Sequence, residues 1–117
     1  MTQGKIIQAI KALDRLKGQP ISLPISYKLY RLRKSLQPHW DWQVEQEMQL
    51  VEKYGEQTEN GMTVKDRAGF DSALSSVVET EIEQDWDAVS IGINDGLNIS
   101  MDDLAVLEEF VKIGDDE

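Results

Sequence analysis

The stretch SYKLYRLRKSLQPHWDWQVEQEMQLVEKY, residues 26 to 54, decides the fold of this 117-residue chain. Its apolar residues recur every three or four positions, a spacing typical of an amphipathic helix that packs on a core through one face. These residues are Leu29, Leu32, Leu36, Trp40, Val44, Met48 and Val51. Ser26 is a candidate N-cap, and Gly55 follows the last turn. The sequence therefore predicts one long central helix.

Pro38 lies in the middle of this predicted helix. Proline has no backbone N–H, and its ring clashes with the carbonyl group four residues back. We therefore expect a kink within a turn of Pro38, or a break that makes Pro38 the first residue of a second helix.

A shorter helix is predicted before the central one, ending near Gly18 and Pro20. Its apolar face is formed by Ile6, Ile7, Ala9, Ile10, Leu13 and Leu16. The segment ISLPIS, residues 21 to 26, is expected to run extended between the two helices.

Two more elements are predicted directly after the central helix. Asn60 and Gly61 form a strong turn signal before the short extended stretch MTVK, residues 62 to 65. Asp66 can cap a third helix, because an aspartate side chain accepts hydrogen bonds from free N–H groups at a helix start. That helix would carry Phe70, Leu74, Val77 and Val78.

Residues 79 to 88 fit two patterns. A helical spacing of four residues relates Leu74, Val78, Ile82 and Trp86. Alternation with Val78, Thr80, Ile82 and Trp86 places carboxylates at Glu79, Glu81, Glu83, Asp85 and Asp87. We favour a strand from about residue 79, because valine, isoleucine, threonine and tryptophan suit a pleated sheet. The pattern continues with shifted parity in VSIGI, residues 89 to 93, which implies a bulge or turn near Asp87.

The C-terminal part predicts a turn at Asp95 and Gly96 and then a last helix. Ser100 to Asp103 has the form of a capping box, which satisfies free N–H groups at a helix start. The expected apolar residues of this helix are Leu104, Leu107, Phe110 and Val111. The tail, residues 114 to 117, is expected to be flexible.

Length and composition fit one compact domain spanning residues 1 to 117, and the predicted helices and strands make it α+β. The prediction is a helix-dominated domain in which a long, kinked helix packs on a shorter one, with a small antiparallel sheet and a C-terminal helix. The chain has no cysteine, which excludes disulfides and is compatible with a reducing cytosol. No apolar run approaches the roughly 20 residues of a membrane span, so we expect no membrane contact.

Charge is divided along the chain. Residues 1 to 37 hold eight Lys or Arg and one acid, a net charge of +7, whereas residues 38 to 117 hold four bases and 21 acids, a net charge of −17. An acidic chain repels phosphates, so direct binding of nucleic acid is not expected. The densest basic cluster is Lys28, Arg31, Arg33 and Lys34.

The order of several motifs resembles a family of small uncharacterised proteins from tailed bacteriophages and prophages, mostly of Gram-positive bacteria. The motifs are LPISYKL, VEKYGE, an NG turn with MTVK, FDSALSSVVETEIE and ISMDDLAVLEEF. The resemblance implies a phage origin and transfers no catalytic residue. The segment PHWDW, residues 38 to 42, departs from the family pattern, which has an ordinary charged helix there.

Catalytic motifs are absent from the sequence: there is no Walker-type loop, no G-x-G-x-x-G, no G-x-S-x-G and no H-E-x-x-H. His39 can pair with Asp41, but one histidine without a thiol does not make an ordinary zinc site. An EF-hand needs glycine at its sixth position, where Ser90 stands if Asp85 is first. We predict that the protein is not an enzyme and has no cofactor or metal.

The sequence therefore predicts a protein that acts by binding another protein of phage or host, with homo-oligomerisation as an option. One alternative is inhibition of a host nuclease or defence complex, with the carboxylates of residues 79 to 87 imitating nucleic acid. Another is a structural or assembly role in the phage particle. The expected location is the host cytoplasm, or the virion for a structural protein.

The predicted partner-binding residues are the basic cluster, two tryptophans that cannot both face inward, and the carboxylates: Lys28, Arg31, Arg33, Lys34, Trp40, Trp42, Glu79, Glu81, Glu83, Asp85 and Asp87. We expect the basic cluster to meet the carboxylates of residues 79 to 87, across the fold or on a neighbouring copy.

Overall fold

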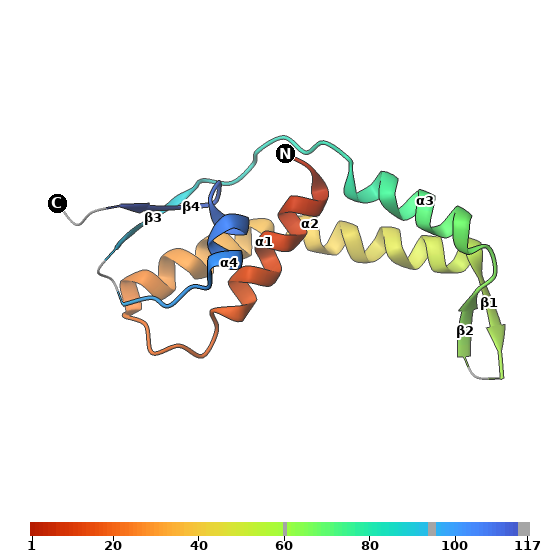
Figure 1. The fold of residues 1–117 in the computed structure, drawn as a ribbon, viewed down its shortest axis with the longest axis horizontal. Helices are drawn as coiled ribbons and strands as arrows, with labels where there is room; N and C mark the ends of the chain where they lie inside the picture. The colour runs from red at the N-terminus through yellow and green to blue at the C-terminus, as the bar shows by residue number, and fades with distance from the viewer. Residues whose placement is uncertain (60, 94–95, 115–117) are drawn as a thin grey trace.

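The computed structural model describes residues 1–59, 61–93 and 96–114 (Figure 1). The elements in chain order are α1 (Gln3–Arg15), α2 (Leu23–Tyr54), β1 (Gly55–Thr58), β2 (Gly61–Val64), α3 (Arg67–Val78), β3 (Val89–Gly92), α4 (Met101–Leu107) and β4 (Val111–Gly114). This arrangement confirms the predicted α+β class, with a long helix packed on a shorter one and a small antiparallel hairpin formed by β1 and β2.

Helix α2 is longer than predicted and is not broken. It begins at Leu23, with Ser22 in the N-cap position, so the predicted cap at Ser26 is wrong. Pro24 fits in the first turn because its missing N–H would have no partner there. The helix continues through Pro38, and Figure 1 shows its axis changing direction between the orange and yellow halves. The predicted kink is therefore present and the alternative break is not.

One end of the molecule, which we call the head, contains the hydrophobic core. The head consists of α1, the first half of α2, β3, α4 and β4, and α1 crosses α2 near its midpoint (Figure 1). The largest fully buried apolar side chains are Ile6, Ile10, Leu32, Leu36, Leu107 and Phe110. Burying each such side chain contributes roughly 1.5–3 kcal/mol, so the head carries most of the stabilisation of the fold.

The other end, which we call the arm, is thinly packed. It consists of the second half of α2, α3 and the hairpin of β1 and β2, and α3 has no fully buried residue. The radius of gyration is 17.5 Å and the molecule measures 57 × 30 × 23 Å. A compact chain of this length would have a radius of gyration of about 13 Å. The arm therefore extends away from the core and buries little apolar surface of its own.

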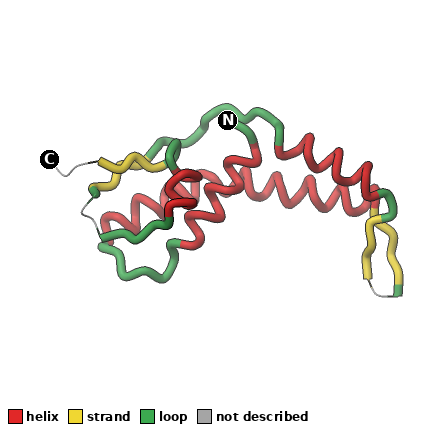
Figure 2. Tube along the Cα trace, in the orientation of Figure 1, coloured by secondary structure: helices red, strands yellow, loops and turns green. Residues whose placement is uncertain are grey.

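The strand predicted from about residue 79 is wrong for residues 79 to 88, whereas its continuation in residues 89 to 93 contains β3. Figure 2 shows the segment between α3 and β3 as a loop, with only an isolated bridge between Thr2 and Glu81. No full strand lies beside this segment; instead the N-terminus supplies two backbone hydrogen bonds, from Gln3 N to Thr80 O and from Ile82 N to Met1 O, both 2.8 Å. The carboxylates of this segment are nevertheless exposed, whereas Trp86 between two of them is buried.

The last helix is shorter than predicted. Helix α4 ends at Leu107, so Phe110 and Val111 are not helical, and Val111 begins β4, which pairs with β3 in parallel. The predicted caps are confirmed: Asp66 accepts a hydrogen bond from Gly69 N, and Ser100 accepts one from Asp103 N. The turn residues Asn60 and Asp95 and the tail residues 115–117 fall outside the described residues.

Candidate protein-binding surfaces

Two members of the predicted basic cluster are used inside the fold. Arg33 is half-buried, donates a hydrogen bond from Nε to Asp14 Oδ1 (3.0 Å) and a second to Gln37 (2.7 Å), and lies over the Trp40 ring. Lys28 Nζ donates to Ser90 O (2.9 Å), which ties α2 to β3. These two cations therefore orient elements of the head.

The other two members remain exposed on α2. Arg31 lies over the Tyr27 ring at 5.8 Å, and Lys34 has no hydrogen bond or ion pair within the described ranges. Tyr27 and Tyr30 are 56% and 58% exposed, although large aromatic side chains are usually covered. The sequence prediction omitted both tyrosines. Their spacing of three or four residues from Arg31 and Lys34 would have placed them on the same exposed face of the helix.

The predicted tryptophans do not form a free surface. Trp40 packs against the head core and beneath Arg33, and Trp42 is half-buried. The third tryptophan is more deeply placed: Trp86 stacks on Phe110 with ring centroids 5.2 Å apart and meets the edge of His39 at 5.9 Å. Trp86 therefore anchors the loop between α3 and β3 on the head.

The five carboxylates of residues 79 to 87 are all exposed. Two of them have partners, since Glu81 pairs with the N-terminal amine (3.0 Å) and Asp85 Oδ1 lies 2.8 Å from His39 Nε2. His39 does not pair with Asp41, which instead accepts a hydrogen bond from Gln37 (2.8 Å). No ion pair between described residues joins these carboxylates to the basic cluster, so the contact expected across the fold is not formed.

A group of apolar side chains at the end of the head was not predicted. This tip patch consists of the exposed residues Ile93, Met101, Leu104 and Ile113. Beside it, between α4 and β4, lies a groove of about 480 Å³. Its lining residues are Ile99, Leu104, Ala105, Leu107, Glu108, Val111, Lys112 and Ile113.

Strand β4 has an open backbone edge beside this groove. Val89 N donates to Phe110 O (3.0 Å) and Ile93 N donates to Gly114 O (2.7 Å) across the parallel ladder. Because successive residues of a strand point their backbone groups to opposite sides, the N–H and C=O groups of Val111 and Ile113 face away from β3. Val111 is buried and Ile113 is 42% exposed, so the part of this edge that another strand can reach lies at Ile113, next to the apolar groove.

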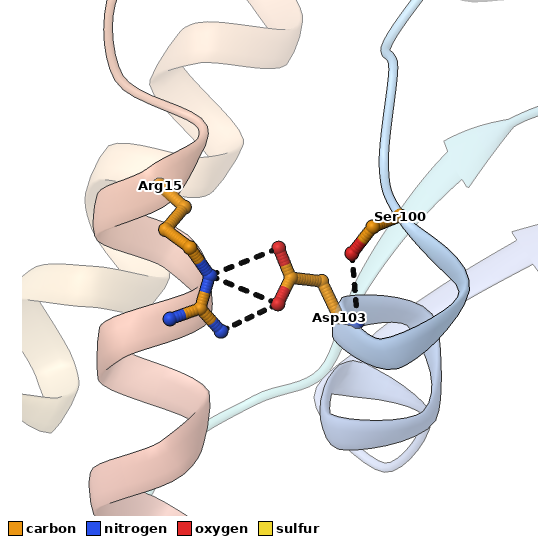
Figure 3. A network of polar contacts seen from close by, with 3 residues as sticks. All are labelled: Arg15, Ser100 and Asp103. Carbon is orange, nitrogen blue, oxygen red and sulfur yellow. Dashed lines mark hydrogen bonds and ion pairs between the residues drawn. The ribbon is translucent and has the colours of Figure 1, made fainter.

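The position of α4 beside the groove is fixed by one ion pair (Figure 3). Arg15 donates from Nε to both oxygens of Asp103 (3.0 and 3.1 Å) and from a second nitrogen to Oδ1, so the contact is bidentate. The hydrogen bonds from Arg15 lower the pKa of Asp103, and desolvation of the carboxylate opposes this shift. The positive charge of Arg15 and the Ser100 hydroxyl lower the pKa of Asp103 further. This pair holds the start of α4 against the end of α1.

No cluster of three or more His, Cys, Asp or Glu side chains suited to a metal ion occurs in the part of the chain that the structure describes. Within the same ranges, none of the helices combines the length and the apolar character needed to cross a bilayer.

Comparisons with known proteins found no match: no family model, no curated protein and no solved structure is significantly similar to this chain.

Proposed function

We propose that this protein is non-enzymatic and acts by binding another protein through the tip patch. The observation that carries this proposal is the groove between α4 and β4, which is lined by two exposed apolar side chains, Leu104 and Ile113, and lies beside the outer edge of β4. Exposed apolar groups of this kind mark interaction sites, and an open edge can accept a strand from a partner while pockets beside it receive alternate side chains.

The resemblance of the sequence motifs to phage and prophage proteins supports an accessory role in an infected host cell. The partner would then be a protein of the phage or of the host, met in the host cytoplasm. A structural or assembly role in the particle is the alternative, in which case the partner is another virion protein and the location is the virion.

The experiment is capture of partners from infected host cells with the wild-type protein and with Ile113→Glu. Ile113→Glu would bury a carboxylate without a counter-charge in the interface, which is costly. This variant should therefore capture at least about tenfold less of the specific partner protein, while its circular dichroism is unchanged. Ser72→Glu, on the exposed side of α3, is the matched control and should capture as the wild type does. Equal capture by Ile113→Glu would refute binding through the tip.

A second candidate function is inhibition of a nucleic-acid-binding host protein by the acidic loop. It is favoured by the five exposed carboxylates on a loop that Trp86 and the N-terminus hold against the head. In the same capture experiment, this function predicts a partner that is retained by Ile113→Glu, released by duplex DNA, and lost when Glu79, Glu81 and Glu83 are changed to glutamine.

A further inference from the structure

The outer face of α2 carries apolar side chains that the fold does not cover. Tyr27, Tyr30 and Met48 are 56%, 58% and 60% exposed, and Leu23 and Val44 are exposed as well. Along this face the spacing alternates between three and four residues, which is the spacing of a coiled-coil seam. We call this the α2 stripe; its residues are Leu23, Tyr27, Tyr30, Lys34, Gln37, Asp41, Val44 and Met48.

All residues of the α2 stripe are exposed except Gln37, which is half-buried. The buried residues of α2 include Leu32 and Leu36, which lie roughly half a turn away from Lys34 and Asp41 at 100° per residue. Both α1 and α3 approach α2 at Gln43, which is also buried: Gln3 of α1 donates a hydrogen bond to it, and Leu74 of α3 lines one pocket with it. From Leu23 to Glu52 this face measures about 43 Å along the helix at 1.5 Å per residue, and it follows the change of direction in the middle of α2 (Figure 1).

Charge changes sign along this face. Its first half carries Arg31 and Lys34, and its second half carries Asp41, Glu45 and Glu52, all of them exposed. The change of sign falls at Gln37 and Pro38, near the middle of the helix.

This order makes the face complementary to itself under a two-fold rotation about its midpoint. Antiparallel pairing brings Lys34 to Asp41 of the second copy and Arg31 to Glu45 of the second copy. It also brings Tyr27 to Met48 of the second copy, so apolar contacts flank the charged centre. Parallel pairing would instead place like charges opposite one another, which is repulsive.

We infer that the α2 stripe binds a second copy of this chain as an antiparallel helix pair, which gives a two-fold symmetric dimer. An isologous interface uses the same surface on both subunits, and three contacts of this surface meet that requirement: Lys34 with Asp41, Arg31 with Glu45 and Tyr27 with Met48 of the second copy. The dimer goes beyond the proposed function and uses a different surface, because the α2 stripe shares no residue with the tip patch.

Charge reversal tests the pairing in sedimentation velocity. Lys34→Glu and Asp41→Lys should each raise the dimer dissociation constant at least about tenfold, because each creates two repulsive pairs in the dimer. The double variant Lys34→Glu with Asp41→Lys restores both pairs and should return to within about threefold of the wild type. Lys11→Glu, an exposed lysine of α1 outside the stripe, is the control for total charge and should leave dimerisation unchanged.

Disulfide cross-linking tests the orientation, since the natural chain has no cysteine. A disulfide needs Cα atoms about 4.4–6.8 Å apart, so Gln37→Cys near the two-fold axis should cross-link to itself. Tyr27→Cys alone should not, because antiparallel pairing separates the two copies of residue 27 by about 31 Å along the axis. A mixture of Tyr27→Cys and Met48→Cys should cross-link.

Either of two results would overturn the inference. One is a wild-type protein that sediments as a monomer at its highest soluble concentration. The other is efficient self-cross-linking of Tyr27→Cys, which would indicate parallel pairing.

Discussion

Asp103 shows how one carboxylate can connect two distant parts of the chain. It lies in the first turn of α4, its side chain is bound by Arg15 at the end of α1, and its backbone N–H is capped by Ser100. By joining the start of α4 to the end of α1, the pair helps to place α4 and, through α4, the groove at the tip.

We expect Asp103→Asn to lower stability at neutral pH and to weaken the dependence of stability on acid. Arg15 lowers the pKa of Asp103 in the folded state, so the ionised carboxylate stabilises the fold above its unfolded pKa, which is about 3.9. That stabilisation is lost as the pH falls through the lowered folded pKa. Urea denaturation of wild type and variant from about pH 7 to about pH 2 measures both effects.

Asp102→Asn is the matched control for this prediction. Asp102 lies in the same first turn, is exposed, and forms no ion pair with any described residue, so its loss removes the same charge without breaking a contact. If Asp102→Asn reduced the acid dependence as much as Asp103→Asn, the effect would belong to the general charge near the helix start and not to the bond with Arg15.

At the scale of elements, α1 and α3 differ in how they are held. Helix α1 has seven buried residues, among them Ile10, whereas α3 has none that is fully buried. Local opening of α3 therefore exposes less apolar surface than local opening of α1. The free energy of opening should accordingly be lower for α3 than for α1.

Native-state hydrogen exchange should accordingly show the α3 amides exchanging faster than those of α1. Leu74→Ala should accelerate exchange in α3 further and leave α1 unchanged. Ile10→Ala, which creates a cavity in the core, should lower the global free energy of unfolding by about 2–5 kcal/mol. Equal protection of α1 and α3 would show that the arm unfolds only together with the head.

The long helix was predictable from local spacing, but its buried face was only partly so. A step of four residues advances 400° around a helix, so the predicted apolar series drifts by about 40° per step. From Leu32 to Met48 the drift is about 160°, which carries Val44 and Met48 out of the core and onto the α2 stripe. Only the positions of α1 and α3 fix which part of such a series is buried.

Residues 79 to 88 and the end of α4 were not predictable from propensity. An alternating segment becomes a strand only beside another strand, and here the N-terminus supplies a single bridge at Thr2. Phe110 and Val111 continue a helical spacing after Leu107, but Val111 pairs with Val89, which lies 22 positions earlier in the sequence. Long-range pairing therefore overrode local pattern at both places.

At the scale of the whole molecule, the division of charge was evident from the sequence. Which acidic residues pair with the basic cluster was not. Arg33 is satisfied by Asp14 within the head, and the loop carboxylates lie elsewhere. The exposed cations Arg31 and Lys34 are left facing solvent on α2. In the proposed dimer their partners are Asp41 and Glu45 of the second copy, which lie on the same helix.

Salt should weaken this dimer without abolishing it. Two-fold symmetry gives four exposed ion pairs, each worth about 0.4 kcal/mol, so their combined loss raises the dissociation constant roughly tenfold. Raising NaCl from about 0.1 M to about 1 M shortens the Debye length from about 10 Å to about 3 Å and removes most of that attraction. The apolar contacts of Tyr27 with Met48 of the second copy are not screened and keep part of the affinity.

Sedimentation velocity at both salt concentrations measures the change, and the charge-swapped double variant should respond as the wild type does. A dissociation constant that is unchanged or smaller at high salt would contradict the charge pairing and leave the aromatic contacts as the whole of the attraction.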